Sequence, residues 1–248
     1  MISICTRMVL NGLRNIFMKN NSLFLLFDKY LDKIPIFFIQ NLMGELINRI
    51  RWRKYLSSHL PGEQAQLKMA PTFRGAFHHD TDPVHAAVLL LMYPSDNGTL
   101  SLVFIKRNEY DGPHSAQISF PGGVWEEGNG HIQNTAIRET REELGIGDDI
   151  EILGSLTELH IPVSNYLVSP FVGCMDHTPV FYPDDSEVQF VIESTIKELL
   201  DPQNRDSETI FRHGQSIRAP FYLAGEEKIW GATAMMLSEF LQLASMQQ

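Results

Sequence analysis

The spacing of apolar residues changes along the chain. In residues 42–58, "LMGELINRIRWRKYLSS", Leu42, Leu46 and Ile50 recur at every fourth position, which predicts an amphipathic helix. From Val84 onward, β-branched and aromatic residues form short runs instead. The runs "VHAAVLLLMY" and "LSLVFIKR", with "PSDNGT" between them, predict two strands joined by a turn.

A second helical pattern follows a short strand, "QISF", which ends at Pro121. In "HIQNTAIRETREELG", Ile132 and Leu144 have helical spacing, and Gly145 is a typical residue just after a helix. The strand, a Pro-Gly-Gly turn and the helix are consecutive, so they form one unit at residues 117–145. We expect the chemistry of the protein to lie in this unit.

The rest of the chain alternates between strands and helices. "IEILGSLTEL", "YLVSPFVGCM" and "APFYLA" predict strands, "STIKELLD" predicts a short helix with Ser194 as N-cap, and "GATAMMLSEFLQLA" predicts a closing helix. "LPGEQAQLKMAPTFR" contains two prolines and predicts a connector. This order indicates an α/β fold with a mixed sheet sandwiched between helices. We expect an extension at 1–42, a helix and connector at 43–83, and the domain at 84–248.

The first 42 residues differ in character from the rest. Residues 1–22 contain three basic residues and no acid, and four charges interrupt the apolar stretch 23–42. These charges argue against a membrane span, which needs about 20 nearly uncharged residues. The segment fits either an organelle presequence or an extension upstream of a start at Met43.

The charge of the chain limits its partners. Among 248 residues, 20 are Lys or Arg and 30 are Asp or Glu, which gives a net charge of -10. This balance argues against a nucleic-acid groove, and an anionic substrate would need a cation as intermediary. Of the two cysteines, Cys5 and Cys174, the second lies in the apolar "PFVGCM" and is expected to be a buried free thiol. A reducing, cytoplasmic location fits best.

Three glutamates share one face of the helix in the central unit. Glu139, Glu142 and Glu143 lie at i, i+3 and i+4, so their carboxylates repel one another unless a cation binds them. Carboxylates suit Mg²⁺ or Mn²⁺. Arg138 is spaced to reach Glu142, and the backbone at Gly123 can approach a metal or a phosphate because no Cβ intervenes. The alternative is a charged, solvated helix face.

The stretch "GGVWEEGNGHIQNTAIRETREELGI" resembles the Nudix box. The general box is Gly, five residues, Glu, seven residues, and Arg-Glu-aliphatic-any-Glu-Glu-any-Gly-aliphatic. Residues 138–146 match its second half except that Thr140 replaces the aliphatic residue, and Asn129 or Gly130 stands where the first half has an acid. The segment between Gly123 and Arg138 is one residue longer than in the general box.

This longer spacing is similar to that of the coenzyme A pyrophosphatase subfamily. In that subfamily an Arg, a His seven residues later, Gly-Gln and Phe-Pro-Gly-Gly precede the box. Here Arg107, His114, Gln117 and the run 120–123 stand in those places, with Ala116 in place of the glycine before Gln. The resemblance covers roughly residues 43 to 245 and also includes "IPVSNYLVSPFVG", "DSEV", "ELLDP" and "IWGATAMML".

The resemblance implies an enzyme that hydrolyses the diphosphate of coenzyme A or its thioesters to (acyl-)4'-phosphopantetheine and adenosine 3',5'-bisphosphate. It implies Mg²⁺ or Mn²⁺ as cofactor, held by Glu139, Glu142, Glu143 and the Gly123 carbonyl. Glu142 or Glu143 is then the general base. Glu187 in "DDSEV" is a second candidate, although an acid there also suits a helix N-terminus.

Substrate binding is expected at Arg107, His114 and Gln117, with Lys106 and Arg74 as further cations. We expect "FHHDTD" at 77–82 not to bind metal, because it has no partner motif, and Trp230 to pack the last helix rather than to stack on adenine. Two other functions remain open: hydrolysis of another nucleoside diphosphate such as ADP-ribose or NADH, and ligand binding by a non-catalytic regulatory module. We expect no nucleic-acid or membrane partner, and a homodimer is possible.

Overall fold

The computed structural model describes residues 48–58, 60–72, 81–95, 98–109, 116–128, 130–147, 149–212 and 214–246. The chain divides into two compact units, Met1–Asn48 and Arg49–Gln248. All described residues except Asn48 belong to the second unit. The domain boundaries expected from the sequence stay predictions. No helix within the described ranges is long and apolar enough to cross a bilayer.

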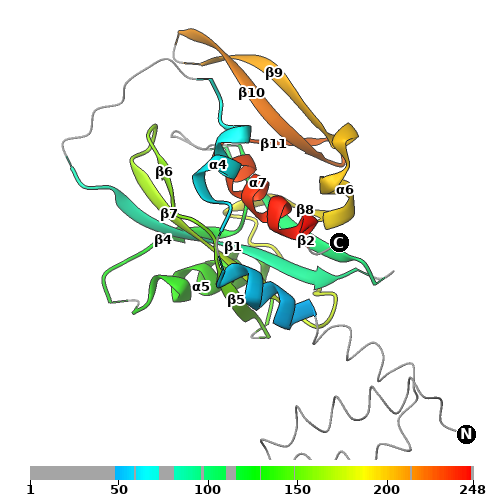
Figure 1. Cartoon of the computed structure of the whole chain (residues 1–248). Helices are drawn as coiled ribbons and strands as arrows, with labels where there is room; N and C mark the ends of the chain where they lie inside the picture. The colour runs from blue at the N-terminus through cyan, green and yellow to red at the C-terminus, as the bar shows by residue number, and fades with distance from the viewer. Residues whose placement is uncertain are drawn as a thin grey trace, which may run out of the picture. The chain divides into compact units, whose positions relative to one another are not determined.

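A mixed sheet of eight strands forms the centre of the second unit (Figure 1). Its strands are β1 Val84–Pro94, β2 Leu100–Arg107, β3 Ile118–Ser119, β4 Gly122–Val124, β5 Glu151–Ser155, β6 Leu159–Ile161, β7 Tyr166–Cys174 and β8 Val188–Thr195. The main path is β3-β2-β1-β7-β5, while β4 pairs with β1, β6 with β7 and β8 with β2. Only the β1–β7 pair is parallel among the described pairings of this sheet.

A second, three-stranded antiparallel sheet and several helices complete the unit. The sheet contains β9 Arg205–Arg212, β10 Gln215–Ala224 and β11 Glu227–Trp230, in the order β11-β10-β9. The helices are α4 Gly62–Gln66, η2 Leu67–Met69, α5 Ile132–Leu144, α6 Ile196–Leu200, η3 Pro202–Asn204 and α7 Gly231–Ser245. Residues 48–56 are also helical.

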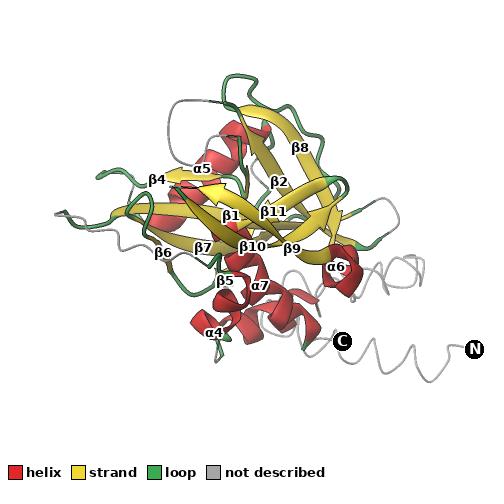
Figure 2. Ribbon diagram, turned by 90° about the horizontal axis from the view of Figure 1, so that it is seen from above, coloured by secondary structure: helices red, strands yellow, loops and turns green. Residues whose placement is uncertain are grey.

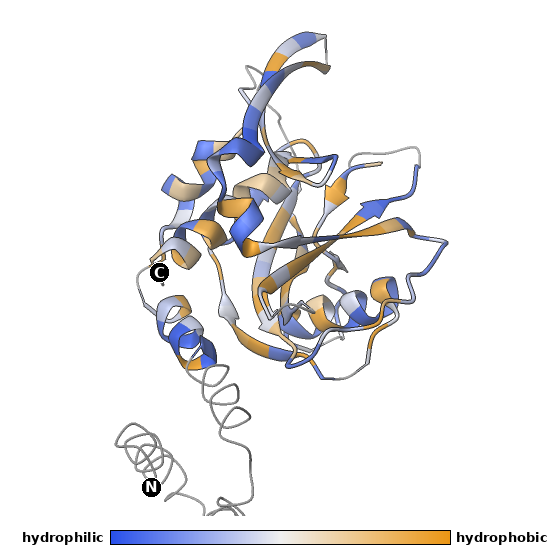
Figure 3. Ribbon diagram, turned by 90° about the vertical axis from the view of Figure 1, so that its right-hand side faces the viewer, coloured by the Kyte–Doolittle hydropathy of each residue, from blue (hydrophilic) through white to orange (hydrophobic). Residues whose placement is uncertain are grey.

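β1 is buried on both faces, as its nearly continuous apolar sequence predicts. One face contributes Leu89 to a core cluster that includes Ala136 of α5. The other contributes Leu90 to a larger cluster that includes Phe240 of α7. The two helices therefore cover opposite faces of the sheet, with apolar residues concentrated along the strands between them (Figures 2 and 3). This arrangement confirms the expected α/β architecture.

Several predicted elements are confirmed. The first two strands are present as β1 and β2, the closing helix is α7, and the helix of the central unit is α5. α5 ends at Gly145, which has φ 61°, the left-handed conformation that favours glycine. The helix predicted at residues 42–58 is present in its described part, residues 48–56. Its Trp52 stacks on Phe240 of α7, with ring centroids 4.8 Å apart.

Two other predictions were incomplete. The connector contains the short helix α4, and the run at 150–159 contains the strand β5 and the first residue of a second strand, β6. Both departures involve Glu239 of α7, which is fully buried. Its carboxylate accepts hydrogen bonds from Gly62 and Gln66 of the α4 segment and from the backbone and hydroxyl of Thr157 between β5 and β6. A buried carboxyl group needs hydrogen-bond partners, and both segments supply them.

The predicted N-cap of α6 was also wrong by one residue. Thr195 caps the helix: its hydroxyl accepts a hydrogen bond from the Glu198 amide, and the Glu198 side chain accepts one from the Thr195 amide. This reciprocal capping box needs Ser or Thr three residues before Glu, which Thr195 satisfies and Ser194 does not. β8, β9 and β11 were not predicted, and the "APFYLA" strand extends to the ten residues of β10.

Candidate functional site

The Pro-Gly-Gly turn lies against both β1 and α5. β4 pairs Gly122 with Val88 and Gly123 with Ala87. Gly122 has φ 152°, and a Cβ there would lie 2.2 Å from the Ala87 carbonyl oxygen, so only glycine fits. A Cβ on Gly123 would lie 2.5 Å from the carboxyl carbon of Glu139. The second glycine therefore leaves room for a carboxylate of the helix against the backbone of the turn.

Glu143 is the most buried of the three helix glutamates, with 2% of its side chain exposed. Its Oε2 accepts a hydrogen bond of 2.8 Å from the Gly122 amide. Its Oε1 lies 3.5 Å from Nη1 of Arg107 and has no hydrogen-bond partner among the described residues. Burial raises the pKa of this carboxyl to about 8, although Arg107 and the Gly122 amide act in the opposite direction.

Arg138 connects the other two glutamates of the helix. Its Nη2 donates to Glu139 Oε1 at 2.6 Å and its Nη1 donates to Glu142 Oε2 at 2.7 Å. The exposed fraction is 17% for the Glu139 side chain and 58% for that of Glu142. Burial raises the pKa of Glu139, against the effect of Arg138. The guanidinium thus fixes the rotamers of two carboxylates that would otherwise repel each other.

Glu187 is held near this helix by backbone hydrogen bonds. The Tyr182 and Asp184 amides donate to the Leu144 and Glu143 carbonyls at the end of α5, at 2.9 and 3.1 Å. On the other side, the Asn108 amide donates to the Glu187 carbonyl at 3.0 Å. The charge of Glu187 also raises the pKa of both Glu139 and Glu143, although its effect is smaller than those of burial and of the closer charged groups. The structure therefore brings this acid into the same electrostatic field as the helix glutamates.

A cavity of about 390 Å³ opens beside the turn and the helix. Among the residues predicted to bind substrate, Arg107 and Gln117 line it, together with Glu139, Gly122 and Gly123. The remaining lining residues are largely apolar and come from β1, β3, β4, β6, β7 and α7, with Phe120 from the turn between β3 and β4: Ala86, Val88, Ser119, Phe120, Val124, Ile161, Tyr166, Val168, Ala232, Thr233 and Met236. The lining therefore combines charged and apolar side chains, which suits a ligand with both characters.

Other predicted residues lie elsewhere or outside the described ranges. His114, Arg74 and residues 77–80 fall on residues that the structure does not describe. Lys106 forms an ion pair with Glu227, at 3.4 Å. Trp230 lies at the start of α7, and it does not line the cavity. The lining residues of α7, such as Thr233 and Met236, were missed because they belong to an ordinary apolar helix pattern.

The residues present fit a divalent cation. The buried Oε1 of Glu143 lacks a hydrogen-bond partner, and such an atom is costly unless another ligand satisfies it. Glu139 lies against the backbone of Gly123. No three His, Cys, Asp or Glu side chains in the described part of the chain are arranged as a metal cage. Two carboxylates with backbone, water and substrate phosphate oxygens match the way Mg²⁺ is usually bound.

Two of the departures from the resembled pattern have a structural explanation. Thr140 is fully buried like the aliphatic residue it replaces, and its hydroxyl donates to the Ala136 carbonyl at 2.6 Å within the helix. Ala116 has φ 54°, a conformation that glycine adopts without strain and alanine does not. The third departure is Asn129 or Gly130 in the place of an acid. Gly130 has φ 67°, and its carbonyl accepts a hydrogen bond from the Trp125 indole.

Comparison with known families agrees with this geometry. The family model of the NUDIX domain matches residues 83–212, which include both the helix glutamates and Glu187. The chain belongs to the Nudix family. It is therefore a hydrolase, and the Nudix domain supports nucleoside diphosphate derivatives as its substrates.

Several similar proteins are named Nudix hydrolases. An uncharacterised Nudix hydrolase NudL of Photorhabdus laumondii is 33% identical over 64% of this chain and 83% of that protein. A NudL of Yersinia pestis is 30% identical over 82% of this chain and 100% of its own length. The mitochondrial Nudix hydrolase 15 of Arabidopsis thaliana is 32% identical over 62% of this chain and 56% of that protein. Among solved structures, the MutT protein of Methanosarcina mazei is 14% identical, with 68% of this chain and 99% of that chain covered and a TM-score of 0.43.

Proposed function

We propose that the protein hydrolyses the diphosphate of coenzyme A or its thioesters, with Mg²⁺ or Mn²⁺ as cofactor. The observation that carries the proposal is the ion pair between Arg107 and Glu143 at the cavity. Arg107 belongs to the motif upstream of the box that resembles the coenzyme A subfamily. The pair joins this motif to the metal-binding helix of the box, so both motifs serve one site.

The mixed lining of the cavity also supports this substrate class. Coenzyme A combines a charged diphosphate nucleotide with a long, less polar arm. The lining includes the charged Arg107 and Glu139 as well as the apolar Ile161 and Met236. Arg107 is suited to bind phosphate oxygens because its planar guanidinium presents several donors. Gln117 also lines the cavity, and its amide can hydrogen-bond the polar part of the substrate.

We assign the metal ligands to Glu139, Glu143 and the Gly123 carbonyl, with Glu142 at the outer edge. When bound, the cation supplies charge that neutralises the diphosphate and favours activation of the attacking water. Arg138 keeps Glu139 and Glu142 in fixed rotamers. This preorganisation means that the carboxylates need not rearrange during the reaction.

A carboxylate then takes the proton of the attacking water. The water oxygen bonds to one phosphorus, the bond from that phosphorus to the bridging oxygen breaks, and the other phosphate leaves with the bridging oxygen. Glu142 and Glu187 are exposed and near the buried pair, so each is a candidate base. Glu143 is the third candidate, but its side chain is almost completely buried and we assign it to the metal.

The substrate assignment can be tested with the full chain. The protein is incubated with Mg²⁺ or Mn²⁺ and, separately, coenzyme A, acetyl coenzyme A, ADP-ribose or NADH, and products are identified by mass. We expect adenosine 3',5'-bisphosphate together with 4'-phosphopantetheine or its acetyl form. The highest kcat/KM on ADP-ribose or NADH, with none on coenzyme A, would refute this substrate. Absence of turnover with every diphosphate would favour a non-catalytic binding module.

Variants separate the roles of the acids. Glu139→Gln should reduce kcat by at least about a hundredfold, because one metal ligand loses its charge. Glu63→Gln is the matched control, since Glu63 is an exposed acid of α4 that does not line the cavity. Glu142→Gln and Glu187→Gln identify the general base. In the variant that has lost this base, kcat no longer falls as the pH is lowered. A cytoplasmic location and a homodimer stay predictions.

A further inference from the structure

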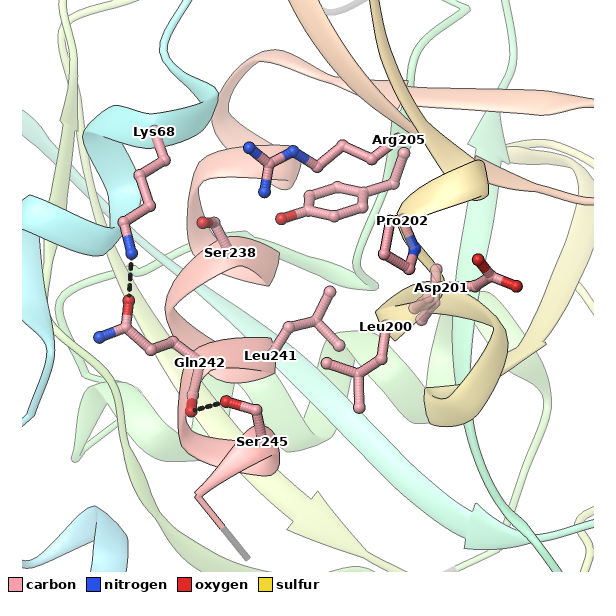
Figure 4. Close-up of a pocket in the computed structure, with 11 residues that line it drawn as sticks. Lys68, Leu200, Asp201, Pro202, Arg205, Ser238, Leu241, Gln242 and Ser245 are labelled. Carbon is pink, nitrogen blue, oxygen red and sulfur yellow. Dashed lines mark hydrogen bonds between the residues drawn. The ribbon is translucent and has the colours of Figure 1, made fainter. Parts of the chain in front are cut away.

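A second cavity, of about 560 Å³, lies on the side of α7 toward α6 and β10 (Figure 4). It is lined by Lys68, Leu199, Leu200, Asp201, Pro202, Arg205, Tyr222, Ser238, Leu241, Gln242 and Ser245. It shares no lining residue with the cavity beside the glutamate helix. Its volume falls within the range of small-molecule sites, and the proposed hydrolysis gives it no role.

Two cations line this cavity. Figure 4 shows the Arg205 guanidinium and the Lys68 ammonium on either side of Ser238. Lys68 Nζ donates to Gln242 Oε1 at 2.6 Å, which uses one of its three donors. The Arg205 side chain makes no hydrogen bond or ion pair with any described residue, and its charge acts on the nearby Tyr222. Both groups therefore have donors available for a ligand.

The other lining groups do not neutralise these cations. Asp201 is the only acid among the described residues that line this cavity. Its Oδ1 accepts a hydrogen bond of 2.9 Å from the Gln203 amide at the start of η3, and its carboxylate points away from the cavity in Figure 4. The cavity therefore has a local excess of positive charge on a chain whose net charge is -10. This excess favours an anionic ligand.

Apolar side chains also line the cavity. Leu200 and Leu241 lie below the two cations in Figure 4 and Pro202 lies above Leu200; Leu241 is 4% exposed. Ser238 and Tyr222 are buried polar residues of the lining, and the serine hydroxyl donates to the Ala65 carbonyl at 2.8 Å. A ligand that fills this space needs an anionic head and a compact apolar part.

We propose that this second cavity binds a phosphate monoester, with the phosphate between Lys68 and Arg205 and the organic group against Leu200, Pro202 and Leu241. A planar guanidinium and a mobile ammonium together can satisfy the several oxygens of a tetrahedral dianion. A carboxylate has two oxygens and one charge, so it uses this pair of cations less fully. This inference does not depend on the substrate of the proposed hydrolysis.

Phenyl phosphate is a suitable probe, because it combines the phosphate with a small apolar ring. Calorimetric titration of the full chain in EDTA should give saturable binding with a Kd below about 1 mM. The double variant Lys68→Gln, Arg205→Gln should raise this Kd at least about tenfold. Lys197→Gln is the matched control: Lys197 is an exposed lysine of the adjacent α6 that does not line the cavity, and its loss should leave the Kd unchanged.

Two further titrations assign the location and the ligand class. Arg107→Gln should leave phenyl phosphate binding unchanged, because Arg107 lines the other cavity. Loss of binding in this variant but not in the double variant would place the probe at the hydrolytic site and overturn the proposal. Benzoate should bind at least about tenfold more weakly than phenyl phosphate. Equal affinity for benzoate, or no measurable binding of phenyl phosphate, would also overturn it.

Discussion

The buried Glu143 carboxyl predicts a specific dependence of stability on pH. Its folded pKa is about 8 because of burial, whereas glutamate in an unfolded chain titrates near about 4.3. The unfolded chain therefore loses this proton at lower pH than the folded protein does. With a raised folded pKa, the stability present below about pH 4.3 is lost as pH rises toward about 8. At about 1.36 kcal/mol per pKa unit, the loss between pH 5 and 8.5 is on the order of 4 kcal/mol.

The variant Glu143→Gln isolates this contribution, because the amide has a similar size and can still accept the hydrogen bond from Gly122. Urea unfolding of both proteins in EDTA, at several pH values from 5 to 8.5, gives the difference in free energy of unfolding. We expect this difference to shift in favour of the variant by several kcal/mol as pH rises. Saturating Mn²⁺ should reverse the loss in the wild-type protein alone, since the metal binds the deprotonated carboxylate. Parallel stability curves for the two proteins without metal would refute the reasoning.

Three further predictions follow from individual residues. Gly123→Ala should lower metal affinity and kcat at least about tenfold, because the added Cβ would lie 2.5 Å from the Glu139 carboxyl carbon. The control Gly147→Ala, at a glycine with open space around it, should change neither quantity. Ala116→Gly should raise the free energy of unfolding by about 0.5–1 kcal/mol, because it relieves the strain of a left-handed alanine. The control Ala70→Gly, at φ -69°, should lower the free energy of unfolding, and chemical denaturation measures both changes. Burial raises the pKa of the Cys174 thiol to about 11, so native protein at pH 8 should be alkylated by iodoacetamide at least about a hundredfold more slowly than unfolded protein, measured by mass of the Cys174 peptide.

The sequence was most informative where one local pattern determines one element. β1 was predictable because an apolar run needs burial on both faces, and α5 because Gly145 ends it in a left-handed conformation. β8 was not predictable, because its buried and exposed residues do not alternate regularly and the exposed Phe190 obscures the two-residue period of a strand. The helix in the connector depends on a distant partner, Glu239, which no local pattern reveals.

The candidate site also combines features that follow from local sequence with features that depend on distant parts of the chain. The helix spacing predicted that Glu139 and Glu143 lie on one face, and both lie near the glycine turn. The placement of Glu187 depends on backbone bonds from a loop to the end of α5, so its proximity could be proposed from the sequence only by resemblance. The apolar part of the cavity lining, which includes Ile161 and Met236, required the tertiary structure because these residues come from separate elements with no shared motif.

The helix glutamates have similar sequence positions but different environments. Glu143 has one oxygen on the Gly122 amide and one without a hydrogen bond, and it is almost completely buried. Glu142, one residue earlier, is mostly exposed and is held by Arg138. A buried carboxylate with an unsatisfied oxygen gains most from a cation, whereas an exposed one can exchange protons with solvent at little cost. We therefore infer that burial, rather than position in the motif, divides metal binding from proton transfer in this enzyme.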